Sequence, residues 1–204
     1  MTASDKAALA AFIADLAATR VSALNRGEQR AYWTNLYNAL TVRVVLEHYP
    51  VKSIRDISLG FLAFGPWSKT LIEVEGEAIS LDDIEHRILR PIWHDPRTHY
   101  SVNCASLGCP NLAPRPYAAA EMERMLDDAA RAYVNHPRGA RFAGDRLVVS
   151  SLYRWYRVDF GGDDEGILLH LRLYATGALA AQLAQATRID DDAYDWSLND
   201  AGAH

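Results

Sequence analysis

The residues best suited to covalent chemistry are the two cysteines of the chain, Cys104 and Cys109, which lie five residues apart in HYSVNCASLGCP. A thiol becomes a strong nucleophile when it is ionised, and a nearby histidine, cation or helix N-terminus favours that ionisation. A loop of small residues follows Cys104, so we expect its side chain where a strand ends beside a cleft. This position favours Cys104 as a nucleophile that attacks a carbonyl carbon.

Other roles fit the same two cysteines. A lone cysteine can be a small, buried apolar residue. The C-x4-C spacing permits a structural or regulatory disulfide if Gly108 and Pro110 allow a tight reversal. A zinc site would need His99, His94 or His86 as further ligands, and structural zinc sites usually contain closer pairs such as C-x2-C. We therefore predict no metal and no cofactor, and we keep thiol redox or metal binding as the alternative.

The segment 99–104 alternates in character and predicts a β-strand. On a strand, His99 and Cys104 point to opposite faces and lie roughly 16 Å apart, at about 3.3 Å per residue. His99 and Arg97 would then be structural or would form the wall of a substrate pocket. The base that activates Cys104 must come from a more distant segment.

That base is expected from LDDIEHRILR, which predicts a helix capped by Ser80 and ended by Pro91. Glu85 falls inside the apolar arc of this helix, and His86 lies on its flank. A buried carboxylate needs a partner. The candidates are a histidine or one of three arginines, Arg90, Arg97 and Arg115. We predict that His86 activates Cys104 and that Glu85 orients the imidazole, with a structural ion pair as the alternative for Glu85.

Asn35 and Asn38 interrupt the most apolar helix of the chain, predicted over 28–48 and expected to be central and buried. Each amide must find hydrogen-bond partners there. They either hold a loop or line one wall of a polar cleft, and Asn38 could instead orient the imidazole or bind the oxyanion. The aromatic residues of the C-terminal half are assigned to packing: Tyr153, Trp155, Tyr156 and Phe160.

The remaining pattern predicts a helix-rich α+β fold, a single domain over 1–204 with a small, mainly antiparallel sheet. Further helices are expected over 6–24, 118–135, 165–174 and 177–186, with a short aromatic helix within 150–162. Hairpins are expected at 70–80, around Glu75-Gly76, and at 140–151, around Gly144-Asp145. The final segment, from 190, is a strand or an ordered tail.

Charge and hydropathy exclude several classes of function. The 21 Lys and Arg residues against 26 Asp and Glu residues give a net charge of -5, which disfavours nucleic acid as a partner. The sequence contains no membrane span and no signal peptide. Two cysteines do not fix the compartment, so the localisation stays open. The substrate is an unidentified small molecule or peptide, and the oligomeric state cannot be read from the sequence.

Four segments together resemble a known family: AYWTNLYNALTVRVVLEHYP, LDDIEHRILRP, DPRTHYSVNCASLGCPNL and YDWSLND. They resemble the domain of unknown function 547 family (DUF547), which occurs in bacteria and plants, and the resemblance covers about 28–200. The family pattern falls on Asn35, Asn38, Glu85, His86, Arg90, Arg97, His99, Cys104, Cys109 and Pro110. Family members often carry more upstream sequence, including secretion signals. The resemblance therefore allows 1–27 to be the remnant of a longer N-terminal region, and a periplasmic or secreted origin.

The order of His86 before Cys104 is also similar to the permuted branch of papain-like cysteine hydrolases and acyltransferases. This second resemblance concerns the arrangement alone. The leading hypothesis is a cysteine-dependent hydrolase or acyltransferase with Cys104, His86 and Glu85 as its catalytic residues. Asn35, Asn38, Arg97 and His99 are the candidate substrate-binding residues. The alternatives are a non-catalytic interaction domain with structural cysteines, and a thiol redox or metal-binding protein.

Overall fold

The computed structural model describes residues 2–57 and 65–200. The α-helices are α1 (Ala3–Ala18), α2 (Arg26–His48), α3 (Arg90–Trp93), α4 (Thr98–Ser101), α5 (Met122–Val134), α6 (Ser151–Trp155), α7 (Asp164–Tyr174) and α8 (Gly177–Leu183). Tighter 3-10 turns are η1 (Val21–Ala23), η2 (Ile54–Asp56), η4 (Ala119–Glu121) and η5 (Arg157–Phe160), and η3 (Asp83–Leu89) is a π-helix. The strands are β1 (Ile72–Val74), β2 (Glu77–Ile79), β3 (Ala140–Ala143), β4 (Arg146–Ser150) and β5 (Asp191–Ala193).

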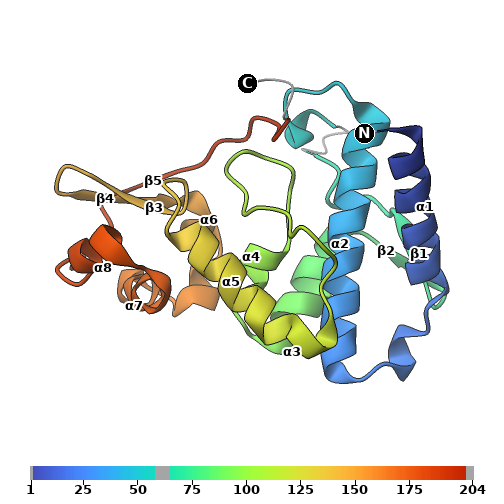
Figure 1. Ribbon diagram of the computed structural model, residues 1–204, viewed down its shortest axis with the longest axis horizontal. Helices are drawn as coiled ribbons and strands as arrows, with labels where there is room; N and C mark the ends of the chain where they lie inside the picture. The colour runs from blue at the N-terminus through green and yellow to red at the C-terminus, as the bar shows by residue number, and fades with distance from the viewer. Residues whose placement is uncertain (1, 58–64, 201–204) are drawn as a thin grey trace.

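The predicted α+β class is confirmed, and the chain is rich in helix. In Figure 1, α1 and α2 lie side by side at one end of the molecule, with the β1–β2 hairpin beside them. At the other end are the β3–β4–β5 sheet and the helices α7 and α8, and α3, α4 and α5 lie between the two ends. Within the described ranges, every helix is too short or too polar to cross a bilayer.

Both sheets are small. β1 and β2 pair antiparallel, as do β3 and β4, so both predicted hairpins are confirmed. The strand β5 joins β4 in parallel and extends the second sheet to the order β3-β4-β5. After β5 the chain runs from this sheet toward the middle of the molecule (Figure 1). The parallel pairing of β5 therefore sets the direction of the C-terminal segment.

The helix α2 contributes more buried residues than any other described element, as its nearly continuous apolar circumference predicts. Its N-terminus is closed by a reciprocal capping box, in which Asn25 accepts from the Glu28 backbone and Glu28 accepts from the Asn25 backbone. Leu36 and Leu40 have no exposed surface. One core cluster forms around α2 and η3, and a second forms between α5, α7 and the β3–β4–β5 sheet.

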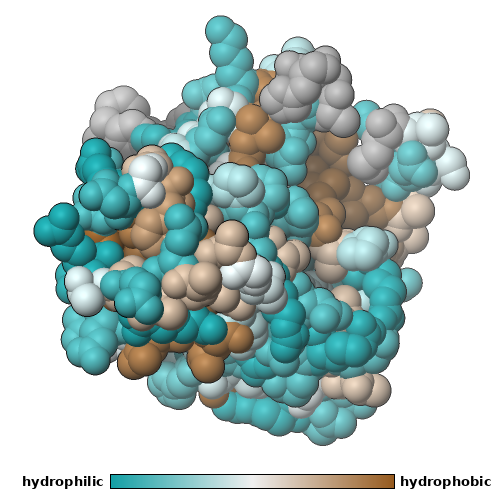
Figure 2. Space-filling view, turned by 60° about the vertical axis from the view of Figure 1, so that its left-hand side comes forward, coloured by the Kyte–Doolittle hydropathy of each residue, from teal (hydrophilic) through white to brown (hydrophobic). Residues whose placement is uncertain are grey.

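Figure 2 shows that hydrophilic residues dominate one face of the molecule, while hydrophobic residues gather in a hollow on it. The two core clusters contain mainly residues from different halves of the chain. A pocket whose lining comes from both halves can therefore form where they meet.

Two sequence predictions about local structure are wrong. Segment 98–101 is the helix α4, and residues 102–104 are extended without joining either sheet. Asp95 and Pro96 form the turn that leads into this helix: the Asp95 side chain accepts from the Arg97 backbone N–H at 2.9 Å, and the Thr98 N–H donates to the Asp95 carbonyl at 3.0 Å. The helical path also does not stop at Pro91. The N–H of Arg90 donates to the Glu85 carbonyl in π register, and Pro91 then lies in the first turn of α3, where its missing N–H costs little.

Candidate functional site

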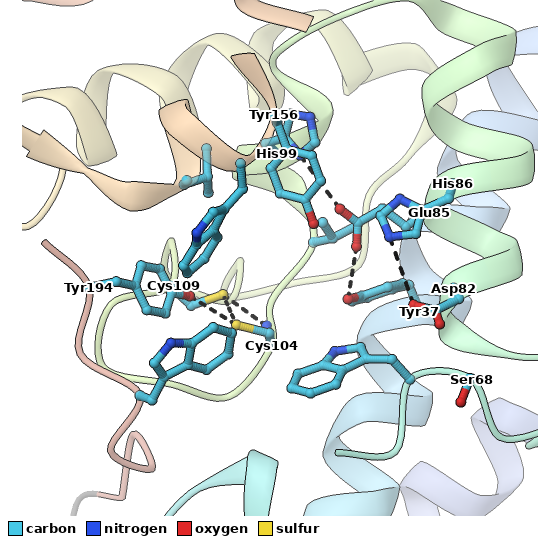
Figure 3. Close-up of a pocket in the computed structure, with 15 residues that line it drawn as sticks. Tyr37, Ser68, Asp82, Glu85, His86, His99, Cys104, Cys109, Tyr156 and Tyr194 are labelled. Atoms are coloured by element: carbon cyan, nitrogen blue, oxygen red, sulfur yellow. Dashed lines mark hydrogen bonds and ion pairs between the residues drawn. The ribbon is translucent and has the colours of Figure 1, made fainter. Parts of the chain in front are cut away.

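The three predicted catalytic residues line one pocket of about 290 Å³: Glu85, His86 and Cys104. On one side the lining comes from α2, η3, α4 and the loop that carries Cys104 and Cys109, here called the cysteine loop. On the other side it comes from α6 and the segment after β5. Figure 3 shows Cys104 and Cys109 beside Tyr194, with Glu85, Tyr156 and His99 grouped together on another wall. The tertiary structure therefore brings thiols, carboxylates and imidazoles to a common cavity.

Cys104 is partly exposed, Cys109 is buried, and both are free thiols. Their Sγ atoms lie 2.8 Å apart. The Cys104 Sγ also lies 3.1 Å from the hydroxyl of Tyr194 and 3.2 Å from that of Ser106. All three neighbours can donate a hydrogen bond to a thiolate at position 104.

These contacts separate the acidities of the two thiols. The pKa of Cys104 falls to about 7, because the hydrogen bond from Cys109 and those from Ser106 and Tyr194 together outweigh the opposing effect of burial. Burial raises the pKa of Cys109 well above its ordinary range, and the neighbouring Cys104 sulfur adds to that rise. Of the two thiols, Cys104 is therefore the one that ionises more readily, and Cys109 stays protonated beside it.

The backbone around Cys104 is held by two asparagine side chains. Asn38 on α2 donates to the Ser101 carbonyl at 2.8 Å and accepts from the Asn103 N–H at 2.8 Å. The side chain of Asn103 in turn donates to the Pro110 carbonyl at 2.6 Å and accepts from the Ala105 N–H at 2.7 Å. The cysteine loop is thus fastened both to the central helix and across its own turn.

Glu85 is buried, as predicted, with an exposed fraction of 6%. Its carboxylate accepts a hydrogen bond from Tyr37 at 3.1 Å and lies 3.6 Å from Nδ1 of His99. Burial opposes the charge of Glu85, but His99, together with the His86 charge and Tyr156, outweighs burial and lowers the pKa. Of the predicted partners, a histidine pairs with Glu85, but it is His99 and not His86.

His99 is in the pocket wall and faces two carboxylates. Its Nε2 lies 2.6 Å from Oδ2 of Asp159, on the far side of the ring from Glu85. Burial lowers the pKa of His99, but the hydrogen bonds to Asp159 and Glu85 outweigh burial and raise it. The ring stacks on Tyr156 with centroids 4.0 Å apart. The expectation that His99 turns away from Cys104 depended on a strand and is wrong, because α4 gives this segment a helical periodicity.

His86 lies on the more exposed flank of η3, as predicted, with 38% of its side chain accessible. Arg90 lies 3.1 Å from Nδ1, and because a guanidinium can only donate, this nitrogen accepts. The Nε2 atom lies 3.8 Å from Asp82. Within the described part of the chain, no histidine ring hydrogen-bonds the Cys104 sulfur. The activation of Cys104 by His86 therefore stays a prediction.

The other predicted binding residues, Asn35 and Arg97, lie outside the lining of this pocket. Asn35 exchanges two hydrogen bonds with the backbone of Tyr117, which is the loop-holding role considered for it. Arg97 forms ion pairs with Asp95, Glu123 and Asp127. The contacts of Asn35, Arg97 and Asn38 favour structural roles.

Sequence analysis missed the contribution of the C-terminal half. Trp155 and Tyr156 line the pocket, so assigning them to packing alone is wrong, whereas Tyr153 and Phe160 are core residues as predicted. Tyr194, in the segment after β5, reaches the cysteines across 90 residues of sequence. The mixture of acidic and aromatic residues at 190–196 is the one signal that could have indicated a role at a site.

Metal binding finds no support in the arrangement. Among residues 2–57 and 65–200, no group of three or more His, Cys, Asp or Glu side chains is placed to hold a metal ion. Two of the three histidines that could have completed a zinc site with the cysteines have other neighbours, since His99 faces Glu85 and Asp159 and His86 faces Arg90 and Asp82.

Comparison with known proteins gives a family and no activity. The family model described as "Protein of unknown function, DUF547" matches residues 21–134, more than half of the chain. No curated protein and no solved structure matches. The match includes both cysteines, Glu85 and His86, but it ends before Tyr156, Asp159 and Tyr194.

Proposed function

The chain belongs to the DUF547 family, and from its pocket we propose that it is a cysteine-dependent hydrolase or acyltransferase with Cys104 as the nucleophile. One observation carries the proposal: the partly exposed thiol of Cys104 opens on the pocket and is surrounded by three hydrogen-bond donors. Such surroundings stabilise a thiolate without a neighbouring imidazole. A purely structural cysteine would gain nothing from them.

The reaction follows from the groups that line the pocket. The Cys104 thiolate attacks the carbonyl carbon of an ester or amide, and the bond from that carbon to the leaving oxygen or nitrogen breaks. The leaving group takes a proton from the imidazolium form of His86, in which Nδ1 carries a proton and no longer accepts from Arg90. Water, or an acceptor alcohol or amine, then attacks the thioester and gives up its proton to His86, which restores the free thiolate.

His86 suits this proton transfer better than His99. The ring of His86 is partly exposed, so solvent and a ligand in the pocket can both reach it. His99 is 2% exposed, and both its nitrogens face carboxylates, so its proton is held in place. The role that fits His99 is to keep Glu85 ionised, while Glu85 holds the hydroxyl of Tyr37 at the pocket wall. This revises the expectation that Glu85 orients His86.

The test is to incubate the protein with a panel of 4-nitrophenyl esters and to follow both nitrophenol release and the intact mass. We expect a covalent acyl adduct on Cys104, no turnover in Cys104→Ala, and a loss of about 10²-fold or more in His86→Asn. His136→Asn, which changes an exposed histidine outside the pocket, is the matched control. Equal turnover in wild type and Cys104→Ala would overturn the proposal and favour a non-catalytic interaction domain.

A second function, dithiol–disulfide exchange, is favoured by the distance of 2.8 Å between the two sulfur atoms. Cys104 would attack a substrate disulfide and release one thiol, and Cys109 would then displace the second thiol and close a protein disulfide. Two protein thiols are oxidised and one substrate disulfide is reduced. Cys109→Ser distinguishes the two functions, because it traps the mixed disulfide and abolishes exchange, whereas acyl transfer needs only the Cys104 sulfur.

A further inference from the structure

One wall of the pocket is a packed group of three aromatic rings, Trp155, Tyr194 and Trp196. The Trp155 and Trp196 rings stack at 26° with centroids 5.3 Å apart, and Tyr194 lies 4.7 Å from each of them. Trp155 nevertheless remains 49% exposed. A large ring that is fixed by its neighbours and still half open forms a preorganised surface for a flat ligand.

This aromatic wall begins at the reactive sulfur. The hydroxyl of Tyr194 lies 3.1 Å from Cys104 Sγ and 2.8 Å from Ser106 Oγ, while its ring packs on both tryptophans. Figure 3 shows Tyr194 directly beside the two cysteines. A ligand group that lies on the wall is therefore only a few bonds from a carbonyl that Cys104 can attack.

The charges of the pocket limit the ligand further. Among the described residues that line it there is no lysine or arginine, and the carboxylates of Asp82 and Glu85 are both present. The positive charge of His99 is matched by Glu85 and Asp159. A charge on His86 would be faced by Asp82 at 3.8 Å, and Arg55, which lies 5.2 Å from the Trp196 ring centroid, is outside the lining. An anionic ligand would therefore meet no positive charge in the lining that a carboxylate does not already face, so the pocket favours an uncharged group.

We propose that the substrate of the Cys104 site is a carbonyl compound that carries an uncharged aromatic ring close to the carbonyl, with this ring stacked on Trp155 beside Tyr194. The inference rests on the proposed function, and it names the class of substrate. The volume of about 290 Å³ suits one ring and a short linker, because it lies at the lower end of small-molecule pockets.

The experiment measures alkylation of Cys104 by three chloroacetamides that carry a benzyl, a cyclohexylmethyl or a carboxymethyl group on nitrogen. In each case the thiolate forms a C–S bond and chloride leaves. Rates are followed by intact mass with peptide mapping, and each is divided by the rate with unsubstituted chloroacetamide on the same protein. We expect the benzyl probe to react about fivefold faster than the cyclohexylmethyl probe, and the carboxymethyl probe to be slowest.

In Trp155→Ala the benzyl preference, taken relative to unsubstituted chloroacetamide on the same variant, should disappear. Leu173→Ala is the matched control, because it truncates another exposed apolar residue, on α7 and outside the pocket. In the wild-type protein, benzamide should slow the benzyl probe by competition. Equal relative rates for the three probes, a preference that survives in Trp155→Ala, or protection by methyl glucoside but not by benzamide would each overturn the proposal.

Alkylation does not require acyl transfer, so the two proposals fail separately. A benzyl preference without ester turnover supports the ring site and refutes the hydrolase. Ester turnover without the preference supports the hydrolase and refutes the ring site.

Discussion

The Cys104 thiol should titrate near neutral pH. With a pKa of about 7, roughly half of it is ionised at pH 7, against roughly 3% for a free cysteine of pKa about 8.5. The ionised fraction is therefore about 15-fold larger. Because a thiolate of lower pKa is also a weaker nucleophile, by about fivefold over this interval, the net gain in rate at pH 7 is only about threefold. The midpoint of the pH profile, and not the rate itself, is the diagnostic quantity.

The assay is alkylation of Cys104 by iodoacetamide between pH 5 and 10, followed by peptide mapping. We expect a midpoint near 7, with Cys109 unreactive until much higher pH. Tyr194→Phe removes one donor to the thiolate and should raise the midpoint by about one unit, as loss of a hydrogen bond to a charged group does. Tyr49→Phe, an exposed tyrosine that bonds Asp200, is the control. A wild-type midpoint at or above about 8.5 would refute the reasoning.

Two further predictions concern the supports of the site. Glu85→Gln should cost about 3 kcal/mol of unfolding free energy at pH 7 in urea denaturation, because His99 loses one of its partners. The pKa of folded Glu85 lies below its ordinary 4.5, so the contribution is present above that pH and is lost as the pH falls through the folded pKa; a difference that persists in stronger acid would contradict this origin. Asn38→Ala should cost about 2 kcal/mol and slow Cys104 alkylation, since the backbone loses two hydrogen bonds. Asn199→Ala, at an exposed position, should do neither.

The sequence by itself determined the features that depend on local patterns. The apolar circumference of 28–48 identified the buried helix, and the arc shared by Leu81 and Leu89 correctly placed Glu85 inside. Turn chemistry located both hairpins, because Glu75-Gly76 and Gly144-Asp145 supply residues suited to tight turns. The order of the motifs also identified the family. In each case the signal lies within a few residues of the structure that it predicts.

The path of 98–101 shows where local patterns mislead. The alternation in HYSVNC indicated a strand, but Asp95 and Pro96 start a helical turn just before it. The sequence already contained this turn signal, an aspartate followed by a proline, which competes with the alternation. Because this segment is a helix and not a strand, His99 lies between Glu85 and Asp159 in the pocket wall. The sequence had predicted that its side chain points away from the site.

Only the tertiary structure decided which residues complete the pocket. Asp159 reaches His99 from 60 residues away along the chain and Tyr194 reaches Cys104 from 90 residues away, while Tyr156 stacks on His99 in the pocket wall. The parallel pairing of β5 with β4 directs the C-terminal segment to the cysteine loop, and no periodicity in the sequence encodes that pairing. The acidity of Cys104 also depends on the fold, because burial and the distant Tyr194 act on its pKa together with Cys109 and Ser106, which are close to it in sequence.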